Sequence, residues 1–281
     1  MKDSIKYISE KLSDTYDQRE CKAIARYLVE EVSGMNYTDI LVKDTKFSEE
    51  QRDKIDIIIK RLINGEPIQY ILGYSYFCNL KIGVKSGVLI PRPETEELCR
   101  LIIDREKINN PKILDICTGS GCIAIALKNE IPNALVDGVD ISETALNIAK
   151  ENSNNCNLNV NFFKYDVLNN TPSLCGNYDI IVSNPPYICN YEKEKMEDIV
   201  LKNEPHLALF VEDENPLVFY DKIAKLGMKI LNNGGMLFFE INPLFHKELQ
   251  SILKNLNYSD IEVIEDINGR RRFIACTRKE I

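Results

Sequence analysis

The sequence has few of the residues that build metal sites. It contains 2 histidines, His206 and His246, and none of its 9 cysteines forms a C-x-x-C pair. A structural zinc site gathers thiolates or imidazoles at short spacings, so we expect no metal. Free cysteines scattered along a chain are typical of proteins from a reducing cytosol.

The chain also lacks an excess of positive charge and a long apolar run. Lys and Arg total 35 against 43 Asp and Glu, for a net charge of -8, which disfavours a nucleic-acid partner bound mainly by bulk charge. No apolar run approaches the length of a membrane span, and the charged start MKDSIKYISEKL has no apolar signal core. We therefore expect a cytoplasmic monomer with no membrane partner and no direct nucleic-acid partner.

What the chain does contain changes in character along its 281 residues. Residues 1–74 show helical spacing only and are expected to form a small helical bundle domain. Its three expected helices cover residues 5–12, 17–32 and 48–64, the last one starting with a capping box at Ser48. Residues 75–92 have β-rich stretches broken by glycines and are expected to form a β-hairpin linker.

The third part, residues 93–281, alternates between apolar strand candidates and helical segments from Lys112 onward. The strand candidates are KILDIC, LVDGVDI, VNFFKY, YDIIVSN, MLFFEI, IEVIED and RFIACT. Alternation of this kind predicts an α/β fold with a parallel sheet covered on both faces. The last two candidates follow each other closely, as an antiparallel edge would.

A glycine-containing loop follows the first of these strands, in LDICTGSGCIAIAL (114–127). Gly119 and Gly121 would allow a ligand to approach the backbone closely, and the helix that follows offers free N–H groups. No Gly-Lys-Ser/Thr follows, and the glycine spacing fails after Gly121, so neither a Walker A loop nor a full dinucleotide fingerprint is present.

Acidic residues end the next two strands. Asp140 lies about 20 residues after the glycine loop, which is the sequence separation at which a carboxylate typically binds both hydroxyls of a ribose. Asp166 is placed to accept from an adenine amino group, with Ile141 and Val167 on either side of the ring. The alternative is that each Asp only caps the following helix, but three such signals in order disfavour it.

The sharpest feature is DIIVSNPPYI (179–188), in which Asn184-Pro185-Pro186-Tyr187 follows a buried strand. Open α/β sheets bind ligands at this end of their strands. The prolines fix an extended turn that presents the Pro185 carbonyl beside the Asn184 side-chain oxygen, and two acceptors suit an NH2 group. Tyr187 is suited to pack on a flat amide or base. The alternative is a rigid strand-terminating turn.

These oxygens predict methyl transfer to a planar nitrogen. An amide nitrogen is a poor nucleophile because its lone pair is delocalised, and gripping both of its hydrogens would aim that pair at an activated sulfonium methyl group. Such a donor requires neither a metal nor a nucleophilic side chain, so positioning would supply most of the catalysis. We accordingly expect Cys117 and Cys122 to pack as small residues and not to act as nucleophiles.

Over nearly its whole length the chain resembles the bacterial release-factor glutamine methyltransferases of the PrmC/HemK type. The segments that carry the resemblance are EPIQYILGYSYF (66–77), LIPRPETEEL (89–98), LDICTGSGCIAIAL, VSNPPYI (182–188), NEPHLAL (203–209) and GRRRF (269–273). The NPPY motif is shared with enzymes that methylate amino groups of nucleic acids, whereas IPRPETE with QYILG is far more specific.

The resemblance implies a class I methyltransferase fold, a Rossmann-like sheet of seven strands, joined to a small N-terminal helical domain. It implies S-adenosyl-L-methionine as methyl donor, S-adenosyl-L-homocysteine as product, and the glutamine of the Gly-Gly-Gln motif in peptide chain release factors as target. It assigns the target amide to Asn184, Pro185, Pro186 and Tyr187. It assigns the cofactor to Cys117, Thr118, Gly119, Ser120, Gly121, Asp140, Ile141, Asp166, Val167 and Asn184, with Arg92, Glu94 and Thr95 nearby.

The chain departs from the family pattern at two places. Residues 210–215 replace a glycine-rich segment, and Glu240-Ile241-Asn242 stands where Glu-x-Gly is usual. We expect both departures to lie away from NPPY and to affect local loop shape and partner contacts. The basic run Arg270–Arg272 is expected to be a solvated turn.

Three other functions remain as alternatives. A ribosomal-protein glutamine methyltransferase would share the motif, and a DNA or RNA amino-group methyltransferase is disfavoured by the net charge. A non-catalytic cofactor-binding partner of the translation machinery would have no need to hold an amide.

Overall fold

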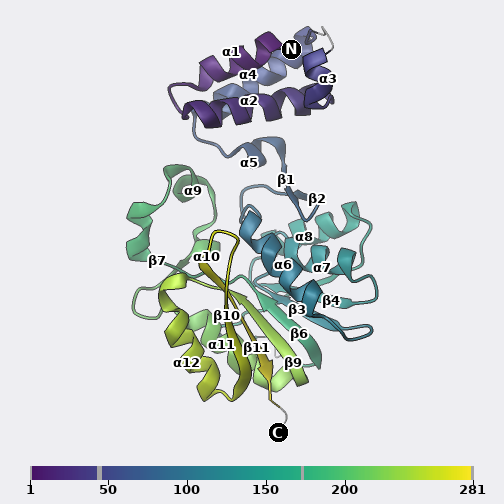
Figure 1. Cartoon of the computed structure of the whole chain (residues 1–281), viewed down its shortest axis with the longest axis vertical. Coiled ribbons are helices and arrows are strands. Elements are labelled where there is room, and N and C mark those ends of the chain that lie inside the picture. The colour runs from purple at the N-terminus through teal and green to yellow at the C-terminus, as the bar shows by residue number, and fades with distance from the viewer. Residues whose placement is uncertain (1, 43–45, 172–173, 280–281) are drawn as a thin grey trace. The chain divides into compact units, whose positions relative to one another are not determined.

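The computed structural model describes residues 2–42, 46–171 and 174–279. The chain divides into two compact units, Met1–Leu72 and Gly73–Ile281 (Figure 1). The hairpin that the sequence assigns to a linker falls within the second unit.

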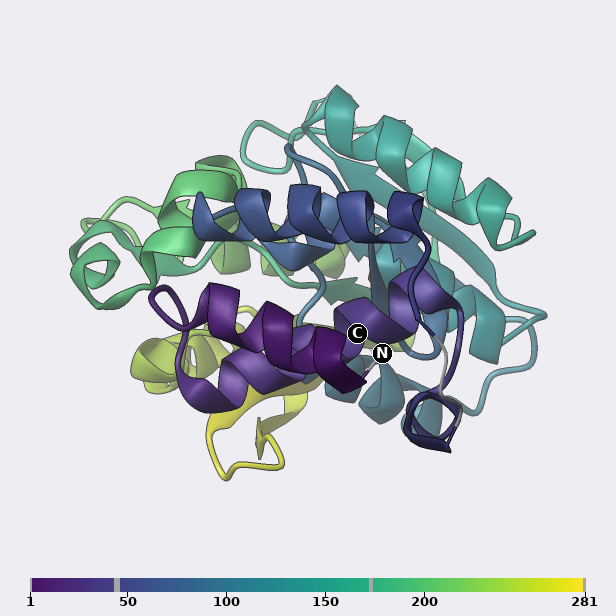
Figure 2. The same ribbon diagram turned by 90° about the horizontal axis from the view of Figure 1, so that it is seen from above.

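The first unit is built on three helices that pack against one another (Figures 1 and 2). They are α1 (Lys2–Leu12), α2 (Gln18–Ser33) and α4 (Glu49–Ile63). Their buried stripes include Ile8, Leu12, Leu28, Ile55 and Ile59. These are the three helices that the spacing predicts. Two short helices, α3 (Tyr37–Val42) and α5 (Ile68–Leu72), were not predicted.

The expected capping box at the start of α4 is confirmed. The Ser48 hydroxyl accepts from the Gln51 amide at 3.1 Å, and the Gln51 side chain accepts from the Ser48 amide at 3.0 Å. This exchange satisfies two backbone groups that a helix N-terminus otherwise leaves unpaired.

The second unit opens with the predicted hairpin, formed by β1 (Tyr74–Phe77) and β2 (Leu80–Gly83). Its turn residues Cys78 and Asn79 both have positive φ, 47° and 61°, which matches the backbone twist that a two-residue hairpin requires. Phe77 and Ile82 are fully buried and belong to a core cluster of the central sheet described next.

Seven strands form the central sheet, in the order β10-β11-β9-β6-β3-β4-β5. In chain order they are β3 (Lys112–Ile116), β4 (Leu135–Asp140), β5 (Asn161–Lys164), β6 (Tyr178–Ser183), β9 (Leu231–Glu240), β10 (Tyr258–Glu265) and β11 (Arg271–Arg278). All seven predicted strands are present. The pairs among β5, β4, β3, β6 and β9 are parallel, and β11 runs antiparallel to both of its neighbours.

Two apolar layers cover the sheet. One contains residues of α6 (Pro93–Arg105), α7 (Cys122–Glu130) and α8 (Glu143–Asn155), and the other contains residues of α11 (Val218–Ile230) and α12 (His246–Asn255). Successive strand residues alternate between the layers, with Ile180 in the first cluster and Ile181 in the second, as the two-residue period of a strand demands.

The remaining elements lie in the loops that follow β6 and β9. They are β7 (Ile188–Cys189), η1 (Asn190–Lys195), α9 (Asp198–Asn203), α10 (His206–Leu209), β8 (Phe210–Val211) and η2 (Pro243–Phe245). Among the helices of the described residues, none has the length and apolar character needed to cross a bilayer.

The strand order changes direction at β3, because β4 lies on one side of it and β6 on the other. Crevices at such a switch point are where open α/β sheets bind ligands. In the parallel register Ile116 pairs with Ser183, so Cys117 and Asn184 leave the sheet side by side. The fold therefore brings the glycine loop next to NPPY.

Candidate active site

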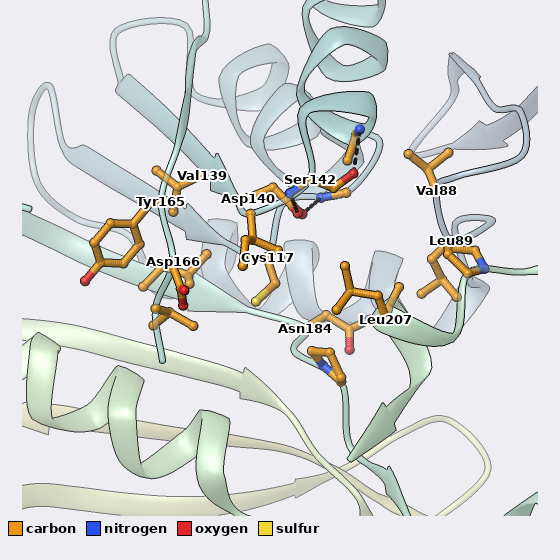
Figure 3. Close-up of a pocket in the computed structure, with 18 of the residues that line it drawn as sticks. Val88, Leu89, Cys117, Val139, Asp140, Ser142, Tyr165, Asp166, Asn184 and Leu207 are labelled. Atoms are coloured by element: carbon orange, nitrogen blue, oxygen red, sulfur yellow. Dashed lines mark hydrogen bonds between the residues drawn. The ribbon is translucent and has the colours of Figure 1, made fainter. Parts of the chain in front are cut away.

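A cavity of about 290 Å³ opens at this switch point (Figure 3). Its lining includes Cys117, Gly119, Val139, Asp140, Ile141, Ser142, Tyr165, Asp166, Val167, Asn184 and Pro186, with Val88, Leu89, Leu207 and Phe219 closing it further. Tyr165 and Asp166 lie on one side, Val88 and Leu89 on the other, and Cys117 and Asn184 between them (Figure 3). Half of the predicted site residues thus line one cavity.

The two loop glycines have different surroundings. A Cβ at Gly121 (φ +80°) would meet Ala149 and Phe162, each at 3.0 Å, whereas a Cβ at Gly119 (φ +55°) would meet nothing within 4 Å. Gly121 therefore permits packing of the helix on the sheet. Gly119 instead leaves the wall of the cavity open to a ligand.

Thr118, Ser120 and Gly121, all predicted at the cofactor, are not lining residues of the cavity. The buried Thr118 hydroxyl donates to Asp115 at 2.5 Å, and the Ser120 carbonyl accepts from Asn152 at 2.9 Å. These hydrogen bonds of Thr118 and Ser120 fix the conformation of the loop on the side away from the cavity.

Asp140 is held by backbone donors on both oxygens. Its Oδ1 accepts from the Ser142 amide and its Oδ2 from the Gly119 amide, both at 2.9 Å (Figure 3). Each carboxylate oxygen has a second lone pair, so the carboxylate can still accept from a ligand. The cap of α8 is Ser142, whose hydroxyl accepts from Ala145, and the helix-cap alternative therefore does not account for Asp140.

The carboxylate of Asp166 is more fully used within its own turn. It accepts from the Leu168 amide at 3.0 Å and from the Asn169 amide and side chain at 3.2 and 2.8 Å. The side-chain hydrogen bond from Asn169 lowers the pKa of Asp166. The residue still lines the cavity next to Val167, where apolar atoms provide a slot for a flat ring.

In NPPY, Asn184 and Pro186 line the cavity, whereas Pro185 and Tyr187 do not. The Tyr187 hydroxyl points into the protein and donates to Glu240 at 3.0 Å. Burial and the Glu240 charge raise the pKa of Tyr187 well above its usual value, so the hydroxyl keeps its proton. This hydrogen bond fixes the position of the Tyr187 ring.

The start of α6 lies behind Asn184. Thr95 accepts from the Asn184 amide at 3.3 Å and donates to Glu240 at 2.7 Å. Arg92 pairs with Glu204 at 2.7 Å, and Glu94 is among the charges that act on Glu240. None of the three residues predicted from PRPET is a lining residue of the cavity. Thr95 instead supports its wall through Asn184, and Arg92 does so through Glu204.

The expectation that the family departures lie away from NPPY is wrong. Asn242 donates its side-chain amide to the Tyr187 carbonyl at 3.1 Å and to Glu192 at 2.9 Å. Within residues 210–215, Phe210–Val211 forms a parallel pair with Ile188–Cys189, directly after Tyr187. Both departures therefore border the motif.

The basic run does not form a solvated turn throughout. Arg272 belongs to β11, and its side chain is 15% exposed and pairs with Asp266 at 3.5 Å. Its charge acts on Tyr187 and Glu240. It thereby lowers the cost of burying the Glu240 carboxylate.

The cysteines beside the loop are poor nucleophiles. Burial raises the pKa of Cys122 to about 12 and raises the pKa of Cys117 well above its usual value. Since the thiolate is the nucleophilic form, neither thiol is suited to covalent catalysis. The cavity instead offers the oxygens of Asp140 and Asn184, which favours catalysis by positioning of the reactants over covalent catalysis.

Two residues that support the walls of the site were not among the site residues predicted from the sequence. Glu204 and Glu240 are buried carboxylates that contact residues more than fifty positions away. An acidic residue is usually a surface residue, and nothing local marks these two as buried.

The fold and its glycine loop define the second unit as a class I methyltransferase. Solved structures share this fold: a methyltransferase from Pyrococcus furiosus has a TM-score of 0.54 at 17% identity, over 83% of this chain and 100% of that one. The METTL16 methyltransferase domain has a TM-score of 0.51 at 19% identity, over 71% and 89%.

Sequence comparisons narrow the class. Residues 3–73 match the family described as PrmC N-terminal domain, and residues 98–209 match the methyltransferase small domain. Release factor glutamine methyltransferases from Bacteroides thetaiotaomicron and Flavobacterium psychrophilum are 45% and 40% identical. The first alignment covers 97% of this chain and 98% of the relative, and the second covers 94% of each. The chain belongs to the release factor glutamine methyltransferase family.

Proposed function

We propose that this chain transfers a methyl group from S-adenosyl-L-methionine to the side-chain amide nitrogen of the glutamine in the Gly-Gly-Gln motif of peptide chain release factors. The observation that carries the proposal is the position of Asn184-Pro185-Pro186-Tyr187, at the carboxyl end of β6 and beside a cavity that the glycine loop and Asp140 complete. Identity of 45% over nearly the whole chain supports the same substrate.

The residues present suit the methyl donor. The Asp140 carboxylate can accept from the ribose hydroxyls, and Gly119 leaves open space at the loop. Ile141, Val167 and Tyr165 offer apolar walls to the adenine. When bound, the donor supplies a methyl group on a sulfonium, which is already activated for transfer.

The chain then has to hold the acceptor nitrogen. The Asn184 side-chain oxygen and the Pro185 carbonyl would each accept one hydrogen of the target NH2, because proline at 185 and 186 removes the backbone donors that compete there. This grip orients the nitrogen lone pair toward the methyl carbon. Placement of two reactants in this way can supply roughly 7–11 kcal/mol of the barrier reduction.

For the first unit we propose the role of orienting the protein substrate, since the target side chain must enter a cavity narrower than a folded surface. The second unit has its own sheet and two core clusters, so deletion of residues 1–72 tests this role. We expect the shortened chain to bind the donor but to methylate intact release factor much more slowly. Undiminished transfer would rule the role out.

The proposed function is tested by incubating the purified protein with a labelled methyl donor, a release factor, a ribosomal-protein fraction and a duplex oligonucleotide. We expect label in the release factor. Label in the ribosomal proteins alone would favour the related glutamine methyltransferase activity, and label in the oligonucleotide alone would overturn the assignment to protein substrates. A cytoplasmic location follows from the proposed substrate.

A further inference from the structure

One buried carboxylate is linked to both ends of NPPY, to Tyr187 directly and to Asn184 through Thr95. Glu240, at the end of β9, is 2% exposed. Its Oε1 accepts from the Tyr187 hydroxyl at 3.0 Å, and its Oε2 accepts from the Thr95 hydroxyl at 2.7 Å. Thr95 also touches Asn184, at 3.3 Å. The two polar side chains of the motif are therefore tied to a single group.

The direction of these hydrogen bonds follows from the number of protons. A threonine hydroxyl has one proton, and an ionised carboxylate can only accept. Since Thr95 donates its proton to Glu240, its oxygen can only accept from Asn184. The Asn184 amide must therefore turn its NH2 toward Thr95, which leaves its oxygen as the group available to a ligand.

We propose that Glu240 is the positioning residue that makes this site selective for a donor NH2 group. Through Thr95 it fixes the Asn184 oxygen as an acceptor, and by its direct contact it fixes the ring of Tyr187. Without this constraint the amide could rotate by half a turn and present a donor, which suits a carboxylate or carbonyl and not an NH2 group. For the identity of the substrate this inference rests on the proposed function. The orientation of Asn184 is inferred from the hydrogen bonds alone and does not depend on that function.

Burial raises the pKa of Glu240, and the charge of Glu94 acts in the same direction. The hydrogen bonds from Thr95 and Tyr187 and the positive charge of Arg272 act in the opposite direction and favour the ionised carboxylate. Hydrogen bonds that involve an ionised acceptor are the strong ones. A neutral glutamine at 240 would have one donor and one acceptor end, so it could not accept from both partners at once.

The test compares Thr95→Val with Thr95→Ser. Valine removes the hydroxyl and keeps the shape, whereas serine keeps the hydroxyl. We expect Thr95→Val to lower kcat for release factor roughly 10- to 100-fold, the worth of a hydrogen bond to a charged group, and Thr95→Ser to restore most of it. Thr277→Val is the matched control, because Thr277 pairs with Met236, four residues before Glu240 on β9.

Two readouts do not depend on methyl transfer. The side-chain amide resonances of Asn184, assigned with Asn184→Ala in 15N-labelled protein, should move in Thr95→Val and stay in place in Thr95→Ser. The Kd for S-adenosyl-L-homocysteine by calorimetry should stay within about twofold in both, since Thr95 does not line the cavity. Unmoved Asn184 resonances together with an unchanged kcat in Thr95→Val would overturn the proposal.

Glu240→Gln gives a second route if the valine variant is unstable. We expect it to move the same Asn184 resonances, and the double variant with Thr95→Val to lose much less than the product of the two single losses. A fully multiplicative loss would show that Glu240 does not act through Thr95. Should the wild type methylate no release factor, the proposed function fails, while the resonance comparison still decides the orientation of Asn184.

Discussion

Arg92 and Glu204 lie 112 residues apart in the chain and form an ion pair at 2.7 Å, in which the Glu204 side chain is 2% exposed. Glu204 also accepts from the buried Ile90 amide at 3.1 Å. One carboxylate therefore ties the segment that carries Pro205 and Leu207, both on the cavity wall, to the PRPET segment.

Glu204→Ala should destabilise the fold by about 2–4 kcal/mol, because it leaves a guanidinium and a buried N–H without their partner. Glu204→Gln keeps the acceptor for Ile90 and should cost clearly less. Urea denaturation of both variants measures the difference. Equal losses would show that the hydrogen bond from Ile90 contributes nothing and that the charge of Glu204 carries the whole effect.

Asp140→Asn should weaken cofactor binding with little effect on kcat at saturation. The substitution replaces one of the two acceptor oxygens by a donor, and hydrogen bonds to a charged group are worth about 1.5–3 kcal/mol, so the Kd should rise roughly 10- to 100-fold. Calorimetry with S-adenosyl-L-homocysteine measures it.

Asp137→Asn is the matched control for that change. Asp137 stands on the same strand but bonds to Tyr178 and Asn161, away from the cavity. An equal loss of affinity in both variants would mean that the effect reports disturbance of β4 and not a ribose contact.

The two loop glycines should respond differently to alanine. Gly121→Ala forces a Cβ against Ala149 and Phe162, each at 3.0 Å, and should lower the unfolding free energy by more than the roughly 1–2 kcal/mol of left-handed backbone strain. The Cβ of Gly119→Ala meets no atom within 4 Å. Its unfolding free energy should therefore fall only by the backbone strain, and its main effect should be weaker cofactor binding. Comparable unfolding losses would contradict this division of roles.

Asp115 should make stability depend on pH. Burial raises its pKa from 3.8 to about 7, and its Oδ1 has no hydrogen-bond partner among the described residues. Below pH 4 the residue is protonated in both states. Between pH 4 and 7 only the unfolded state ionises, so stability falls as pH rises, by at most about 1.4 kcal/mol per unit.

Asp115→Asn removes this titration and leaves the other groups unchanged. The unfolding free energy of the wild type minus that of the variant should therefore decrease between pH 5 and 7 and level off above pH 7. Denaturant titrations at several pH values measure this difference. A difference that is constant or increasing over that range would show that Asp115 ionises normally in the folded chain.

The parts of the structure that local patterns determine could be predicted from the sequence. Buried runs such as KILDIC and YDIIVSN became β3 and β6, and Ser48 with Gln51 formed the expected capping box. The short helices α3 and α5 were missed because 6 and 5 residues do not complete two turns of a helical pattern.

The residues that support the site could not be found in this way. Glu240 forms hydrogen bonds with Thr95 and Tyr187, which lie 145 and 53 residues away in the sequence. A local periodic pattern carries no information on contacts between such distant residues. Asn242 was expected to lie away from NPPY, yet the strand that it follows, β9, is the neighbour of β6, so the residues after each strand meet. Strand order decides these contacts, and it emerges only from the complete fold.

The central claim is that Asn184 and its neighbours present an NH2-bearing side chain to the methyl donor. It is tested most directly by mass spectrometry of release factor after incubation with wild type and with Asn184→Ala, alongside the Kd of each for S-adenosyl-L-homocysteine. We predict one added methyl group on the Gly-Gly-Gln glutamine with the wild type, almost none with the variant, and similar affinities. Equal methylation by both proteins, or a methyl group on another residue, would contradict the account.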